Sequence, residues 1–156
     1  MQLSELFSAS DVVVNFAPTD KWEAIRKLVG HLVAEGKLAA DTEVDVLEAV
    51  LSRERSMSTG MEQGIAIPHA AVEGLESVVA CIGVVSEPGL SFESIDGRPT
   101  RVIVLLIIPK AQKLLHIRTL ADVARALGRD EIRNELLKAA SPEDALAALT
   151  AGEKAL

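Results

Sequence analysis

Two nearly continuous apolar runs dominate the hydrophobic pattern of the chain. Residues 78–85 read VVACIGVV and residues 102–108 read VIVLLII. Runs of this kind are typical of strands that are covered on both faces, because alternation disappears when neither face meets water. Shorter strands are expected at residues 12–16 and at residues 65–67, the second of them ending at Pro68. The pattern therefore predicts a sheet that lies between layers of helices.

Apolar residues at helical spacing fill most of the remaining chain. Helices are expected at residues 21–35, from after Asp41 to near Arg53, at 114–127, at 130–140 and from Pro142 to about residue 150, with a short helical turn at 3–7. Asp20 with Glu23 forms a capping pair, Gly128 can end a helix, and Ser141 can cap the last one. In the helix after Asp41, the residues expected to face the core are Val44, Leu47, Val50 and Leu51.

These elements combine into one α/β domain over residues 1–156, with its core at about residues 3–150. We expect a central mixed β-sheet with helices on both faces. Turns at residues 87–89 and 96–97 separate the two long apolar runs, with a short strand near residues 91–92 between the turns. Hydrophobic residues make up 49% of the chain and aromatic residues only 3%, so aliphatic side chains must fill the core.

The charge balance and the cysteine count exclude several classes of protein. The chain has 16 Lys and Arg residues against 23 Asp and Glu residues, a net charge of -7, and no basic stripe that could follow a phosphate backbone, so nucleic acid is not an expected partner. No apolar run approaches the ~20 residues of a membrane-spanning helix, and the first residues lack the pattern of a secretory signal. A single cysteine suits a reducing compartment, so a cytoplasmic location is expected.

Residues 53–70, RERSMSTGMEQGIAIPHA, concentrate groups that suit chemistry on an anion. They provide a fixed cation, two hydroxyls, a glycine turn and an imidazole, which are Arg53, Ser58, Thr59, Gly60 and His69. A guanidinium can hold a phosphoryl oxygen in two hydrogen bonds, and hydroxyl and amide groups can donate more. The same residue types also form ordinary loops after ordinary helix ends, so none of them is specific by itself.

Pro68 gives His69 a better-defined position than most histidines have. A histidine in a globular domain is usually an ordinary surface or core residue, and that reading stays open here. The preceding proline restricts the backbone, so the imidazole leaves the expected strand end on a rigid support. Histidine has an unperturbed pKa of ~6.5, so a neutral ring nitrogen is available to attack phosphorus. These features fit a histidine that accepts a phosphoryl group and passes it on.

The other histidines and the cysteine carry weaker signals. His116 shares an apolar helical stripe with Leu120 and Val123, which is typical of a packed histidine, but it also lies near a helix start just after an apolar strand, where α/β proteins build sites. His31 is expected on the exposed side of its helix, and Cys81 is expected to be buried and inert. No cluster has metal-ligand spacing, and without a GxxxxGK[ST] motif ATP is not an expected phosphoryl donor.

The segment LSRERSMSTGMEQGIAIPHA at residues 51–70 closely resembles the signature of the fructose/mannitol-type (type 2) enzyme IIA domains of the bacterial phosphoenolpyruvate-dependent sugar phosphotransferase system. The nitrogen-regulatory enzyme IIA proteins belong to the same group. The resemblance extends over the whole domain, because three later segments fall where that family has equivalents. These segments are DGRPTRVIVLLIIPK, HIRTLADVARAL and SPEDALAAL. The motif ending in GIAIPH is specific.

The resemblance implies a role for each candidate residue. His69 is implied to be the phosphorylated nucleophile and His116 the second, supporting histidine of the site. The phosphoryl-binding residues that match the family's RE pair and STG turn are Arg53, Ser58, Thr59 and Gly60. No cofactor and no metal are expected. Residues 61–63 depart from the family, which usually has a glycine and an asparagine there, and Glu62 places a negative charge near a site for a phosphoryl dianion.

Two functions follow from the resemblance. In the first, an HPr-like phosphocarrier protein phosphorylates His69, and the phosphoryl group then passes to an enzyme IIB domain for sugar uptake. In the second, a nitrogen-type regulatory enzyme IIA uses its phosphorylation state to control binding to partner proteins and moves no sugar. A third hypothesis, a non-catalytic α/β interaction domain, predicts no phosphorylation.

Overall fold

The computed structural model describes residues 3–154, apart from the side chains of Ser4, Lys113, Leu115, His116, Glu153 and Lys154. Within this range one sheet contains β1 (Val12–Phe16), β2 (Ile65–Ala66), β3 (His69–Val72), β4 (Val79–Val85) and β5 (Val102–Pro109). The α-helices are α1 (Leu3–Leu6), α2 (Lys21–Ala34), α3 (Glu43–Ser56), α4 (Lys113–Leu127), α5 (Asp130–Lys138) and α6 (Pro142–Lys154), and two 3-10 helices are η1 (Ala9–Asp11) and η2 (Ala40–Thr42). None of the described helices is both long and apolar enough to cross a membrane.

The sheet is mixed, and β5 lies at its centre. The strands follow the order β1-β4-β5, and both β2 and β3 pair with the remaining edge of β5. β1 is parallel to β4, β4 is antiparallel to β5, and β2 and β3 are parallel to β5. Ile65 of β2 lies opposite Val102, and His69 of β3 lies opposite Leu106. β2 and β3 are therefore two pieces of one edge, placed end to end along β5.

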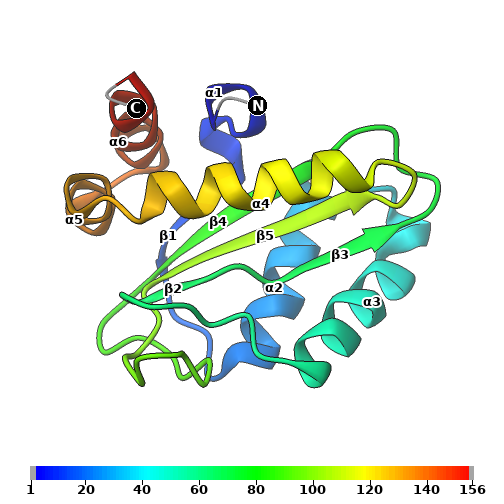
Figure 1. Cartoon of the computed structure of the whole chain (residues 1–156), viewed down its shortest axis with the longest axis horizontal. Coiled ribbons are helices and arrows are strands. Elements are labelled where there is room, and N and C mark those ends of the chain that lie inside the picture. Colours follow the sequence, from blue (N-terminus) through cyan, green and yellow to red (C-terminus); the bar gives the residue numbers. More distant parts are fainter. Residues whose placement is uncertain (1–2, 155–156) are drawn as a thin grey trace.

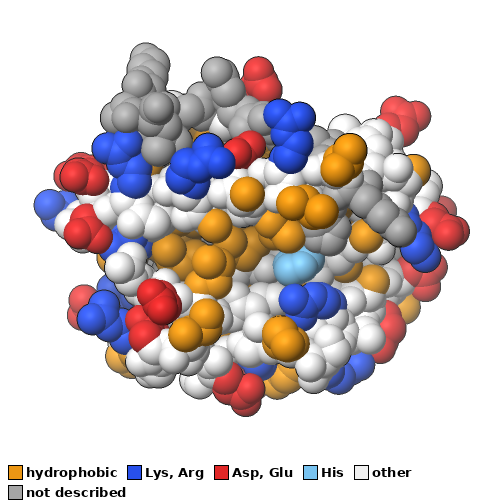
Figure 2. All heavy atoms as spheres, viewed as in Figure 1, with side chains coloured by type: hydrophobic (Ala, Val, Ile, Leu, Met, Phe, Trp, Pro, Cys, Tyr) orange, Lys and Arg blue, Asp and Glu red, His pale blue; other side chains and the backbone are white. Residues whose placement is uncertain are grey.

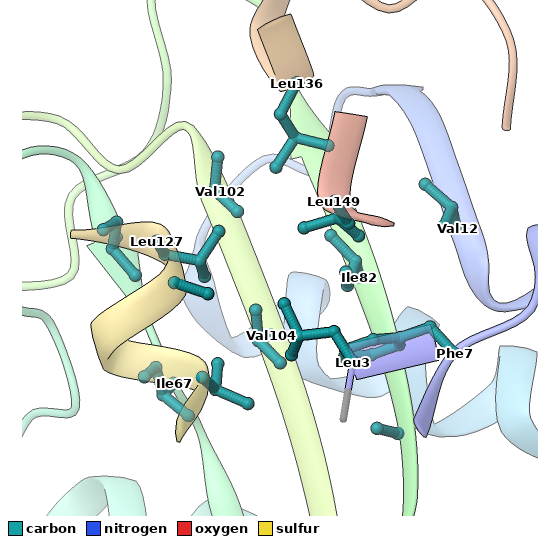
Figure 3. Packing of buried hydrophobic residues seen from close by; sticks show 14 of the residues in the cluster. Leu3, Phe7, Val12, Ile67, Ile82, Val102, Val104, Leu127, Leu136 and Leu149 are labelled. Atoms are coloured by element: carbon teal, nitrogen blue, oxygen red, sulfur yellow. The ribbon is translucent and has the colours of Figure 1, made fainter. Parts of the chain in front are cut away.

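Helices cover both faces of this sheet (Figure 1). On one face α1, α4, α5 and α6 pack against strand residues that include Ile82 and Val104, as Figure 3 shows. On the other face α2 and α3 pack against the alternate strand residues, which include Cys81 and Leu105. Successive residues of a strand point to opposite faces, so two buried faces explain why β4 and β5 are apolar throughout.

The expected fold class, an α/β domain with a mixed sheet and helices on both faces, is confirmed. The strands predicted from the two long apolar runs and at residues 12–16 appear as β4, β5 and β1. α2 begins after Asp20, whose carboxylate accepts a hydrogen bond of 2.8 Å from the backbone N–H of Glu23. α6 begins after Ser141, whose hydroxyl accepts a hydrogen bond of 3.1 Å from the N–H of Asp144, and it extends past the expected end near residue 150.

The expected inward face of α3 is wrong at one position. Val44 is 77% exposed, whereas Val46, Val50 and Glu54 are buried. Residues four apart on a helix share a face, and a residue two positions away points about 200° from it. The buried stripe of α3 therefore ends in a carboxylate, close to the segment that carries the candidate site.

The strand expected near residues 91–92 does not form in the described chain. Leu90 and Thr100 make only an isolated bridge. The ring of Phe92 is fully buried in the cluster between the sheet and the α2–α3 layer. This segment therefore closes one side of the core without extending the sheet.

The strand expected at residues 65–67 is shorter than predicted, and His69 begins β3 instead of following a strand end. Pro68 has no N–H to donate to the sheet, which explains why the pairing along β5 is interrupted between β2 and β3. Pairing resumes at His69 opposite Leu106. The candidate histidine is therefore held in the sheet by its own backbone.

Two glycines test the packing of this fold in opposite directions. A Cβ atom at Gly83 of β4 would lie 2.6 Å from Cδ2 of Phe16, so Gly83→Ala should lower the free energy of unfolding by about 1–3 kcal/mol. A Cβ atom at Gly30 of α2 would lie 3.6 Å from Oε1 of Glu43, which is an ordinary van der Waals contact. Gly30→Ala should therefore raise the free energy of unfolding by about 0.5–1 kcal/mol. Urea unfolding measures both, and a Gly83→Ala protein as stable as the native one would contradict this packing.

Candidate functional site

A hollow of about 390 Å³ lies between α4 and the loop of residues 57–64, here called the site loop, which joins α3 to β2. Its lining residues are Arg53, Ser58, Thr59, Gly60, Met61, Ile67, His69, Ile95, Leu120, Ala121 and Ala124. Figure 2 shows this hollow as hydrophobic surface with a histidine and a basic side chain at one end. The structure thus brings together all the predicted site residues of the segment 53–70.

His69 is partly exposed in this hollow, and its ring is oriented by the backbone. Its Nδ1 atom lies 2.8 Å from the carbonyl oxygen of Ile67. A carbonyl oxygen only accepts hydrogen bonds, so Nδ1 must carry the proton. In the neutral ring, Nε2 then holds the lone pair. The contact therefore selects the tautomer in which Nε2 is the nucleophilic nitrogen.

Arg53 lies in the last turn of α3 and is half-buried at the hollow. One of its N–H groups, on Nη1, donates a 2.8 Å hydrogen bond to the carbonyl oxygen of Met57, the residue that ends the helix. A guanidinium carries five N–H donors in a fixed plane, so this contact orients the group and uses only one of them. A fixed positive charge therefore borders the hollow that contains His69.

The two hydroxyls of the site loop make contacts within the protein. Ser58 Oγ donates to the carbonyl oxygen of Phe92 and accepts a 3.0 Å hydrogen bond from the N–H of Gly60. Thr59 Oγ1 donates to Oε1 of Glu54 at 2.5 Å. Gly60 is tightly enclosed, because a Cβ atom there would lie 2.8 Å from the carbonyl oxygen of Phe92. In this structure these groups fasten the loop to its surroundings, and their expected contact with a phosphoryl group stays a prediction.

The buried carboxylate of Glu54 holds the site loop in place through Thr59. Its side chain is completely buried and accepts hydrogen bonds from both the N–H and the hydroxyl of Thr59, at 2.9 and 2.5 Å. The ammonium of Lys21 lies 3.3 Å from the same carboxylate and 4.9 Å from the ring centre of Trp22. Sequence reasoning missed both Lys21 and Glu54. The available signal was the spacing of four that places Glu54 on the same face as Val50.

The remaining candidates are placed as follows. His116 lies in the first turns of α4, one turn before Leu120, and its side chain lies outside the described residues. Glu62 is exposed and does not line the hollow. His31 lies outside the hollow, with Nε2 2.6 Å from the carbonyl oxygen of Ser10.

Cys81 is buried as expected, and desolvation raises the pKa of its thiol well above the usual range, with the negative charge of Asp11 adding to the shift. The thiol is therefore protonated and unreactive at neutral pH. Among the described residues, no group of three or more His, Cys, Asp or Glu side chains is arranged to hold a metal ion. The candidate groups for chemistry that line the hollow are His69 and Arg53.

The described chain is thus an α/β domain in which a mixed sheet lies between two helical layers and a histidine and an arginine line one hollow. The family model described as "Phosphoenolpyruvate-dependent sugar phosphotransferase system, EIIA 2" matches residues 5–152, and the chain belongs to that family. The resemblance seen in the sequence is therefore confirmed over nearly the whole chain.

Relatives of two kinds are similar to this chain. The fructose-specific EIIABC component of the phosphotransferase system of Bacillus subtilis is 33% identical over 94% of the chain, which spans 22% of that longer protein. A nitrogen regulatory protein of Pseudomonas aeruginosa is 27% identical over 92% of the chain and 91% of its own length. The crystal structure of the nitrogen regulatory protein IIA-Ntr from Neisseria meningitidis superposes with a TM-score of 0.83 and 28% identity, covering 94% of this chain and 98% of that one.

The buried carboxylate under the site loop gives a testable prediction. Glu54→Gln keeps the shape but leaves the ammonium of Lys21 buried without its counter-charge, which typically costs about 3–5 kcal/mol. We expect urea unfolding to show this loss and the amide of Thr59 to exchange its hydrogen faster. The matched control is Glu48→Gln on the same helix, an exposed partner of Arg55, which should change stability by less than about 1 kcal/mol. Equal effects of the two substitutions would contradict the anchoring role.

Proposed function

We propose that this protein is a phosphohistidine relay. Nε2 of His69 accepts a phosphoryl group from an HPr-like phosphocarrier protein and passes it to an enzyme IIB domain during sugar uptake. The observation that carries this proposal is the contact between Nδ1 of His69 and the carbonyl oxygen of Ile67, in a hollow that Arg53 also lines. Membership of the enzyme IIA family and the likeness to a fructose-specific EIIABC component support it.

The transfer needs only one bond to form and one to break. The lone pair of Nε2 attacks phosphorus in line, while the bond from phosphorus to the ring nitrogen of the carrier's phosphohistidine breaks and its electron pair stays on that ring. The proton on Nδ1 of His69 remains in place, so the phosphorylated ring carries a positive charge beside the carbonyl oxygen of Ile67. The reverse of these steps hands the group to the acceptor. Positioning and charge stabilisation are sufficient for this kind of transfer.

The phosphoryl group brings a charge of about -1.5 to -2 into a protein whose net charge is already -7. Local positive charge must therefore offset the overall repulsion, and Arg53 supplies it in this proposal. Ser58, Thr59 and Gly60 form the wall of the hollow next to the phosphoryl group, and Glu54 holds that wall in place. His116 is proposed as the supporting histidine, on the family resemblance.

A carrier protein must approach the ring closely, and the surface around the hollow suits such an approach. Large apolar side chains remain exposed in the segments that border it: Met57, Ile95, Leu114 and Ile117. Exposed apolar groups of this size are typical of protein–protein contacts. In the proposed cycle the carrier and the acceptor use this same face in turn, since both must reach His69.

Phosphorylation by phosphoenolpyruvate, enzyme I and HPr tests the proposal. The native protein should take up one phosphoryl group, His69→Ala none, and Arg53→Ala should be labelled about 10–100-fold more slowly, because hydrogen bonds to a charged group contribute ~1.5–3 kcal/mol. Phosphorus NMR of the native product should show a phosphohistidine substituted at Nε2, because Nδ1 is engaged with Ile67.

His31→Ala is the matched control, since His31 lies outside the hollow, and it should be labelled at the native rate. Circular dichroism of each variant establishes that it is folded. Full labelling of a folded His69→Ala protein would overturn the assignment of the nucleophile.

A second candidate function is regulatory, in which phosphorylation of His69 changes the charge of the exposed face and so controls binding to a target protein. The observation that favours it is the similarity to nitrogen regulatory proteins over nearly their full length. We expect IIB domains of the source organism, added one at a time, to remove the label from the phosphorylated protein if the relay is correct. If none does, and a pull-down captures a kinase or channel only in one phosphorylation state, the regulatory function holds instead.

A further inference from the structure

A second cavity, of about 320 Å³, is lined by Gln63 and Gly64, at the end of the site loop that joins β2. Three of its lining side chains are arginines, Arg98, Arg101 and Arg133, and we call it the arginine cavity. They come from the segment before β5 and from α5, so only the folded chain brings them together. Neither the proposed phosphoryl transfer nor its partners account for three guanidinium groups at this place.

Two of these guanidinium groups are held in position by backbone carbonyls. Nε of Arg101 donates to the carbonyl oxygen of Val85 at 2.6 Å, and Nη1 of Arg133 donates to that of Leu127 at 2.7 Å. Their side chains are only 23% and 11% exposed. Each contact uses one of five N–H donors and fixes the plane of the group. The cavity therefore presents two preorganised cations, whereas Arg98 is 69% exposed at its edge.

Each arginine also has a carboxylate neighbour, but these do not fill the cavity. Glu87 lines it, is 85% exposed and lies 3.6 Å from Arg101, longer than a charge-assisted hydrogen bond. The other two carboxylates, Asp96 and Asp130, are not among the lining residues. Asp96 lies 3.7 Å from Arg98 and accepts hydrogen bonds from the backbone N–H groups of Gln63 and Arg98, which hold the pKa of its carboxyl below its usual value. Asp130 pairs with Arg133 and is 77% exposed.

The remaining wall is largely apolar and is formed by Pro88, Pro99, Val102 and Leu137. A cavity of this volume is at the small end of the range for organic ligands, about 300–1,000 Å³. Guanidinium groups match the oxygens of a phosphate, and the apolar wall suits a carbon skeleton. We propose that the arginine cavity binds a small organic phosphate, a phosphomonoester of the size of a sugar phosphate.

The site is separate from the histidine hollow but shares the site loop with it. Met61 lines the histidine hollow, whereas Gln63 and Gly64 line the arginine cavity. The proposed ligand contacts arginines and bonds to no histidine, and the binding does not depend on the relay function. A protein that failed to accept phosphate at His69 would still bind the ester, so the two proposals can fail independently.

Titration of the full chain with glucose 6-phosphate, followed by amide NMR spectra and calorimetry, tests this site. Saturable binding with a Kd of about 1 mM or tighter is expected, with the largest shifts at Gln63, Gly64 and Leu137. Glucose and inorganic phosphate, titrated in the same way, should each bind at least tenfold more weakly. Glucose has no phosphate for the arginines, and inorganic phosphate has no carbon skeleton to contact the apolar wall.

Arg98→Gln should weaken binding of glucose 6-phosphate at least tenfold without disturbing the fold, because the side chain of Arg98 is 69% exposed. The matched control is Arg55→Gln, which also removes an exposed arginine beside a carboxylate but lies outside the cavity, and it should bind as the native protein does. No saturation by about 10 mM, unchanged affinity in Arg98→Gln, or shifts centred on Arg53 and His69 would each overturn the proposal. Equal affinity for inorganic phosphate would overturn the role of the apolar wall.

Discussion

A single buried carboxylate, that of Glu54, holds the candidate site in place. It lies between the ammonium of Lys21, at the start of α2, and the backbone and hydroxyl of Thr59 in the site loop. A buried charge is tolerated only when it is paired and hydrogen-bonded, and here both conditions are met at once. The site loop is therefore bonded to α3 through Glu54, and the ion pair with Lys21 connects it to α2. These contacts fix the position of a glycine-containing segment beside His69.

The sheet supplies the other half of the support. β5 is buried along its whole length, and the two short strands β2 and β3 use it as a common template. The interruption at Pro68 separates them, so that His69 starts a new strand at a defined register opposite Leu106. The site loop and β3 both contribute residues to the hollow. Contacts with the core hold each of them in place, and neither depends on the intrinsic conformational preference of its own residues. This arrangement explains how a hollow whose wall includes the turn at Ser58–Gly60 can have a defined geometry.

The sequence predicted the architecture well where the hydrophobic pattern depends directly on which residues are buried. The apolar runs of β4 and β5 indicated a sheet covered on both faces, and the caps at Asp20 and Ser141 marked two helix starts. The candidate residues of the segment 53–70 all line one hollow, whereas its walls at Ile95 and on α4 were not predicted. One error arose where tertiary contacts decide: Val44 was assigned to the core, whereas Val46 and Glu54 lie on the buried face of α3. The arginine cavity left no signal, since its residues belong to segments far apart in the chain.

The carbonyl oxygen of Ile67 has a consequence beyond its one hydrogen bond. It belongs to the first of the two residues between β2 and β3, and it accepts a hydrogen bond from the ring of His69 two residues later. The choice between the two imidazole nitrogens is thus made by the main chain, at a point where the sheet is discontinuous. A scan that exchanges side chains around the hollow would leave this main-chain acceptor in place and would miss its effect.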